Sequence, residues 1–111
     1  MEGVNSATSL RRVRRSIDRI DRQLVRLLAE RAGFVTAATR FKRTPGEVRA
    51  PARVAEVLRN VRRLARRHGL PPGIAERVWR VMITAFIRLQ MAEHSRLRSG
   101  RARRAREEKS R

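Results

Sequence analysis

A single apolar stripe constrains this sequence more than any other feature. Near its start the chain repeats apolar residues every three or four positions: Leu10, Val13, Ile17, Ile20, Leu24, Leu27, Phe34, Ala38 and Phe41. This spacing predicts one helix with an apolar face, capped by Thr8 or Ser9. About 33 helical residues span about 50 Å, whereas a domain of this size has a radius of gyration near 13 Å. The stripe therefore needs a second copy to cover it, which predicts an intertwined homodimer.

Prolines and glycines divide the rest of the chain. Thr44-Pro45-Gly46 ends the first helix, and residues 43–50 are expected to form a loop. A second helix is predicted from Pro51 to Arg67, and a third from the turn at residues 71–73 to about Arg96. The sequence has no tyrosine and little alternation of apolar and polar residues. The predicted fold class is all-α, a three-helix protomer with a long first helix.

The helical domain is predicted to cover residues 10–96. The polar residues 1–9 and the basic segment 97–111 have little to bury and are expected to be disordered.

The 29 basic residues, of which only Lys42 and Lys109 are lysine, give a net charge of +19. Such a charge attracts any anion and predicts at least non-specific adhesion to nucleic acid. A basic helical nucleic-acid-binding protein is thus one hypothesis, although the aromatic residues lie on or beside the apolar stripes and are not expected to stack on bases.

Several kinds of chemistry have no candidate residues in this sequence. It has no cysteine, and neither His68 nor His94 has a carboxylate at ligand spacing, so we expect no metal and no cofactor. Motifs for phosphate loops and for nucleophilic or paired-carboxylate catalysis are also missing. With no run of 18 apolar residues and no signal-like start, the chain is expected to avoid membranes and to be cytoplasmic.

Two cations fall where the long helix should be apolar. Arg31 continues the heptad of Leu24, so its charged group either reaches water at the edge of the bundle or meets an anion. Lys42 follows eleven residues later and lies within about 20° of the same face of an ideal helix. Arg14 projects from nearly the same side, but about 25 Å from Arg31 along the axis. An antiparallel partner helix would bring a second copy of Arg14 beside Arg31.

Two further polar residues have ambiguous positions. Gln90 lies on the apolar stripe of the third helix, where a buried amide needs a hydrogen-bond partner, either another helix or a ligand. Arg53 lies in the first turn of the second helix, either on a solvated face or near a ligand.

An ordered set of motifs resembles the AroQ-class chorismate mutases over residues 10–96. The set comprises Ile17-Asp18-Arg19-Ile20-Asp21, Leu27-Leu28-Ala29-Glu30-Arg31, Arg40-Phe41-Lys42, Arg53 and Gln90. The resemblance implies an intertwined homodimer whose site, completed by Arg14 of the other chain, holds a small dicarboxylate. It implies that Arg14 and Arg31 bind the carboxylates. Lys42 and Gln90 would be catalytic, donating to the ether oxygen of the enolpyruvyl group, and Arg53 would help the loop to close.

The segment around Arg53 separates two activities within this class. Chorismate mutases usually carry a glutamate directly after this arginine to contact the C4 hydroxyl, whereas here Val54 follows. The Arg40-Phe41-Lys42 and Ala50-Pro51-Ala52-Arg53-Val54 segments resemble the isochorismate pyruvate lyases, although Ala52 replaces a glutamate common in lyases. The resemblance implies a lyase that forms salicylate and pyruvate from isochorismate by a pericyclic reaction, in salicylate biosynthesis. Chorismate mutase and aminodeoxychorismate mutase, both isomerases, remain alternatives.

Overall fold

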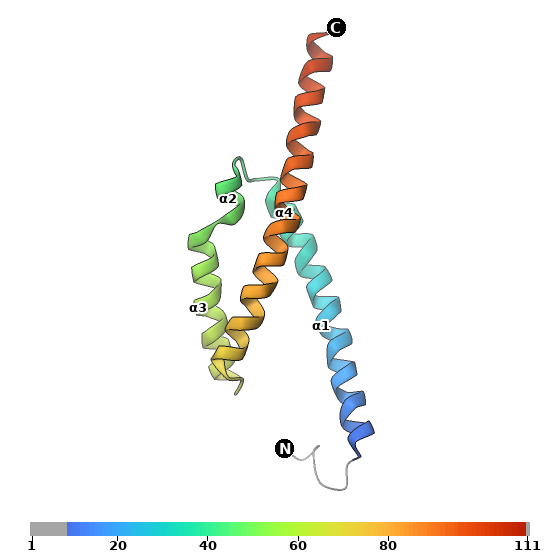
Figure 1. Ribbon diagram of the computed structural model, residues 1–111, viewed down its shortest axis with the longest axis vertical. Helices are drawn as coiled ribbons and strands as arrows, with labels where there is room; N and C mark the ends of the chain where they lie inside the picture. The colour runs from blue at the N-terminus through green and yellow to red at the C-terminus, as the bar shows by residue number, and fades with distance from the viewer. Residues whose placement is uncertain (1–8, 111) are drawn as a thin grey trace. The chain divides into compact units, whose positions relative to one another are not determined.

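The computed structural model describes residues 9–110, and these form helices joined by short turns (Figure 1). The helices are α1 (Leu10–Thr39), α2 (Pro45–Arg49), α3 (Pro51–Arg67) and α4 (Pro72–Lys109). No strand occurs between residues 9 and 110, which confirms the all-α fold class. The disorder expected at residues 1–8 and 111 falls outside the described residues. The chain divides into two units, one ending at Phe34 and one beginning at Val35.

The first unit consists of α1 up to Phe34. Ser9 caps this helix as predicted, because its hydroxyl accepts a hydrogen bond from the Arg12 amide at 3.2 Å. Within the single chain the apolar stripe faces solvent: Ile17 and Leu24 are each 51% exposed. The stripe is therefore present as predicted, and the chain itself leaves it largely uncovered.

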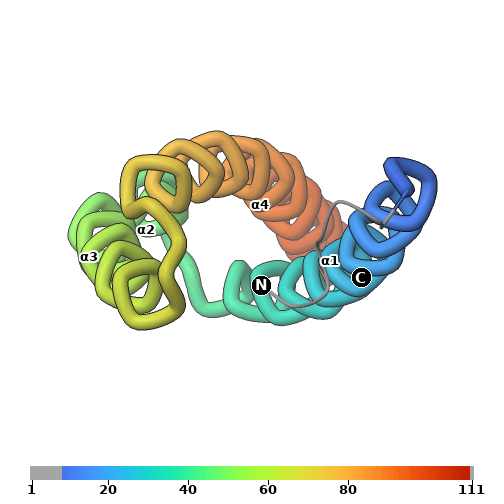
Figure 2. The backbone as a smooth tube through the Cα atoms, turned by 90° about the horizontal axis from the view of Figure 1, so that it is seen from below, coloured from blue at the N-terminus to red at the C-terminus, as the bar shows by residue number. Residues whose placement is uncertain are grey.

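The core of the second unit lies between α3 and α4, which run side by side from the turn that joins them (Figures 1 and 2). Val61 and Ala65 of α3 meet Ala75 of α4, and Val57 and Trp79 pack around them. The α3 boundaries agree with the prediction. Gly69 adopts a φ of +74° in the turn, a left-handed conformation that glycine adopts without steric cost.

An ion-pair network ties α3 to α4 beside this core. The Glu76 carboxylate accepts hydrogen bonds from Arg62 of α3 at 2.8 Å and from Arg80 of α4 at 3.1 Å. The pKa of Glu76 is lowered chiefly by the hydrogen bond from Arg80, with Arg62 adding to the effect. The charged form of Glu76 thus favours the packed pair of helices.

The connection after α1 differs from the predicted loop. The helix ends at Thr39, and the next three residues turn more tightly, with amides that bond to carbonyls three residues earlier at 3.1–3.2 Å. The prediction that residues 43–50 form a loop is wrong in part, because Pro45–Arg49 is helical. Val48, only 3% exposed, anchors this short helix, which packs against α4.

Helix α4 continues well beyond its expected end at about Arg96. It runs to Lys109 through the segment 97–111 that was expected to be disordered. The segment contains no proline and is rich in arginine and alanine, which are among the best helix formers. Helix propensity therefore outweighs the lack of apolar residues to bury, which was the basis of the prediction.

Candidate functional site

The first unit carries two of the predicted site residues, both on α1. Arg14 is exposed and Arg31 is half-buried. Seventeen residues separate them, which is about 25 Å along a helix. One chain therefore cannot bring both guanidinium groups to the same small molecule through this helix.

The second unit brings Gln90 to the end of α1. The Gln90 side chain is half-buried on α4, and its Nε2 donates to the carbonyl of Val35 at 3.5 Å. A primary amide has two N–H donors, so one remains for a ligand once the other is held by Val35. The sequence left open whether the Gln90 amide bonds to another helix or to a ligand. The structure gives the amide a partner on α1, and its second N–H remains as a donor for a ligand.

Lys42 lies in the turn just after α1. Its side chain is half-buried, and its backbone N–H donates to the Thr39 carbonyl at 3.1 Å. The prediction that Lys42 shares a helical face with Arg31 assumed an ideal helix through residue 42, whereas the helix ends at Thr39, so the shared face stays a prediction. The turn, and not helical periodicity, sets the direction of this lysine.

Arg53 lies in the first turn of α3 and pairs with Glu56, one turn further along. Both side chains are more than half exposed, and exposed pairs of this kind contribute little stability, so Arg53 can exchange this partner for a ligand. Val54 beside it is half-buried, with its N–H donating to the Ala50 carbonyl at 3.0 Å. Because residue 54 is a valine, no carboxylate directly follows Arg53 at the start of α3.

Two residues that sequence analysis missed hold the connection between Lys42 and α3. Thr44 caps α2, its hydroxyl accepting from the Glu47 N–H at 3.1 Å, and Glu47 accepts from the Arg43 N–H at 2.5 Å. This hydrogen bond from Arg43 is the main reason that the pKa of Glu47 lies below its ordinary value. The signal was available in the sequence, since a threonine followed three residues later by a glutamate is typical of a helix start.

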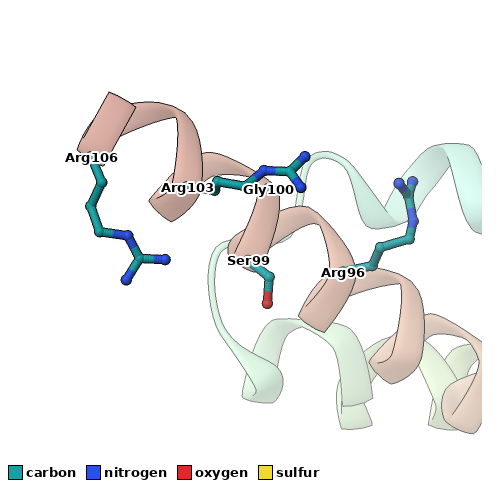
Figure 3. Close-up of a pocket in the computed structure, with 5 residues that line it drawn as sticks. All are labelled: Arg96, Ser99, Gly100, Arg103 and Arg106. Carbon is teal, nitrogen blue, oxygen red and sulfur yellow. The ribbon is translucent and has the colours of Figure 1, made fainter. Parts of the chain in front are cut away.

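A hollow on α4 is lined by none of the predicted site residues. Figure 3 shows its lining residues, Arg96, Ser99, Gly100, Arg103 and Arg106, all from the C-terminal part of this helix. Arg96 pairs with Glu93 at 2.6 Å, which lowers the pKa of that glutamate. The hollow, of about 560 Å³, is lined by three arginines, of which Arg96 is already paired with Glu93.

The described part of the chain brings no three His, Asp or Glu side chains together at metal-binding distances. His94 is only 5% exposed, because it lies four residues after Gln90 and eleven after Ile83 on the packed face of α4. None of the described helices is long and apolar enough to cross a membrane.

The described helices define an all-helical protein in which the Gln90 amide contacts the C-terminal part of α1 and Lys42 follows that helix directly. Comparison with known sequences agrees: residues 13–91 match the family described as chorismate mutase type II. The chain belongs to this family. A curated relative, the isochorismate pyruvate lyase of Pseudomonas aeruginosa, is 35% identical over 91 residues, which cover 82% of this chain and 90% of the relative.

Proposed function

We propose that this protein is an isochorismate pyruvate lyase, which converts isochorismate into salicylate and pyruvate. The observation that carries the proposal is Val54. This apolar side chain directly follows Arg53 at the start of α3, where the mutases that the sequence resembles have a glutamate. Isochorismate has its ring hydroxyl at C2 and not at C4, so it has no need of that carboxylate. The 35% identity to a curated lyase supports the same choice.

The proposed active form is a homodimer. Leu10, Ile17, Ile20, Leu24 and Leu27 of α1 are between 47% and 62% exposed in the single chain. A contiguous apolar stripe of this kind is expected to be covered by a partner. An antiparallel second copy of α1 would cover it and would supply the second chain's Arg14. The proposed site then holds one substrate carboxylate by Arg14 and the other by Arg31.

The proposed reaction needs no nucleophile. The hydrogen on C2 of the ring passes to the methylene carbon of the enolpyruvyl group while the ether carbon–oxygen bond breaks. The ring becomes aromatic salicylate, and the departing group becomes pyruvate. Negative charge grows on the ether oxygen as the bond breaks, and the Lys42 ammonium and the second Gln90 N–H would stabilise it. Binding of both carboxylates would hold the enolpyruvyl arm over the ring.

Two isomerase activities are the alternatives within the family. Chorismate mutase forms a carbon–carbon bond at the same methylene carbon, and aminodeoxychorismate mutase carries out the corresponding rearrangement on a substrate with an amino group at C4. Purified protein incubated separately with isochorismate, chorismate and aminodeoxychorismate separates the three. The proposal predicts salicylate from isochorismate well above the uncatalysed rate. Prephenate from chorismate without salicylate from isochorismate would contradict it.

Adhesion to nucleic acid is a second proposed property, favoured by the extension of α4. The helix runs to Lys109, beyond the family match that ends at residue 91, and carries the hollow of Figure 3. Phe34 and Phe41 are also 70% and 85% exposed in the single chain, although the proposed dimer would cover the stripe to which they belong. A nucleic-acid-binding function predicts sequence preference at moderate salt, whereas adhesion through charge alone is lost there.

A further inference from the structure

The connection between α1 and α3 is held by contacts of its own residues. Its helix α2 has five residues, far too few to be stable by itself. At one end Val48, 3% exposed, anchors α2, which packs against α4. At the other end the Glu47 carboxylate accepts from the Arg43 N–H, and the Thr44 hydroxyl accepts from the Glu47 N–H. Together these contacts order the segment that the sequence analysis expected to be an open loop.

Two hydrogen bonds act on the peptide groups on either side of Lys42. The N–H of Lys42 itself donates to the Thr39 carbonyl at 3.1 Å. The next peptide group, which joins Lys42 to Arg43, donates its N–H to the Glu47 carboxylate at 2.5 Å. Fixing both peptide planes fixes the φ and ψ of Lys42, because these are the two free backbone dihedral angles of a residue. The direction in which the lysine side chain leaves the backbone is thereby set.

Glu47 also acts through its charge. Lys42 is among the cations that lower the pKa of this carboxyl, after the hydrogen bond from Arg43 and the effects of Thr44 and the Arg43 charge. The carboxylate is therefore within electrostatic reach of the lysine, but its direct hydrogen bond is to the backbone. This geometry favours a role in holding the turn over one in contacting a substrate.

We propose that Glu47 is a positioning residue that holds the backbone of Lys42 in the orientation that the reaction needs, with Thr44 holding Glu47 in turn. The proposal rests on the proposed function, in which Lys42 donates to the ether oxygen. A donor that is already in place costs no reorganisation when charge develops on the substrate. Glu47 acts on the rate of the chemical step and leaves the binding of the substrate carboxylates to other residues.

The test compares two substitutions at one position in the full-length protein. Glu47→Ala removes the acceptor, and we expect kcat for isochorismate to fall about tenfold with KM within about twofold, because small errors of position are costly in catalysis. Glu47→Gln keeps an acceptor oxygen, and we expect it to retain most of kcat. The matched control is Glu107→Ala, which removes an exposed glutamate near the end of α4 and should leave both constants unchanged.

A second pair of variants tests the same contact from the other side. Thr44→Ser keeps the hydroxyl and should behave like the unmodified protein, whereas Thr44→Val should lower kcat in the same way as Glu47→Ala. Hydrogen exchange measured by NMR reports on the turn independently of activity. We expect faster exchange of the Arg43 amide in Glu47→Ala and in Thr44→Val, with the helical content by circular dichroism unchanged.

The results of these experiments distinguish a failure of the Glu47 inference from a failure of the proposed function. If the unmodified protein is active and Glu47→Ala has the same kcat, this inference is wrong and the proposed function stands. An equal loss in Glu47→Gln and Glu47→Ala would also overturn it, since the charge and not the hydrogen bond would then matter. If the unmodified protein turns over none of the three candidate substrates, the proposed function fails, and the inference fails with it.

Discussion

The apolar stripe of α1 predicts that Leu24→Ala weakens the association of two copies of the chain. Leu24 is 51% exposed in the single chain. Burying a whole leucine side chain contributes about 1.5–3 kcal/mol, so covering the exposed half contributes about 1 kcal/mol in each copy. A dimer contains the substitution twice, which gives about 2 kcal/mol and raises the dissociation constant of the dimer about 30-fold.

Sedimentation equilibrium over a series of protein concentrations measures this constant directly. The matched control is Leu64→Ala, because Leu64 is 50% exposed but belongs to α3 and not to the α1 stripe. We expect the control to change the constant by no more than about twofold, as exposed substitutions usually do. Equal weakening by both variants, or an unmodified protein that is monomeric at every concentration, would refute the reasoning.

Three further predictions concern the site and the core of the second unit. Lys42→Ala should lower kcat about 10²–10³-fold, the usual loss for one preorganised donor, while the neighbouring Arg43→Ala should have little effect in steady-state assays. Arg31→Ala should raise KM about tenfold or more with little change in kcat, whereas Arg22→Ala, nine residues away and on the opposite face of α1, should not. Because the pKa of Glu76 in the folded protein lies below its ordinary value of 4.5, its contribution to stability is present above pH 4.5 and is lost as the pH falls through the lowered pKa. Melting temperatures should therefore fall more steeply below pH 4.5 in the unmodified protein than in Glu76→Gln, and equal slopes would contradict this reasoning.

Helix α3 could be predicted closely because its ends depend on local chemistry. Proline suits a first helical turn, and glycine adopts the left-handed conformation after a last turn, so Pro51 and Gly69 mark the boundaries in the sequence itself. The end of α4 could not be found in this way. Past Arg96 the pair Ser99-Gly100 is of a kind that often ends a helix, but α4 continues through it to Lys109, in line with the helix propensity of its arginines and alanines.

The connection between α1 and α3 shows where local signals conflict. Pro45 and Gly46 were interpreted as ending a helix, but the same proline also begins α2, whose cap is Thr44 and whose anchor is Val48. The anchor depends on α4, far away in the sequence. The sequence pattern indicates the cap residue Thr44, but it does not indicate the packing against α4 that stabilises so short a helix.

The residue types of the site could be predicted from the sequence more fully than the positions of their side chains. Gln90 was identified as an amide that needs a partner, and the structure supplies the carbonyl of Val35. The direction of Lys42 was derived from ideal helix periodicity, which fails because the backbone tightens after Thr39. Arg14 is predicted to reach the site from the second chain of a dimer, so its place in the site depends on dimerisation as well as on folding.

The central claim is that a valine after Arg53 marks a lyase and not a mutase. The most direct test measures salicylate fluorescence from isochorismate and prephenate from chorismate with the same purified protein. The account predicts salicylate formation well above the uncatalysed rate, with kcat/KM for isochorismate exceeding that for chorismate. Prephenate formation with no salicylate would contradict it and would identify the protein as a mutase that acts without a carboxylate at residue 54.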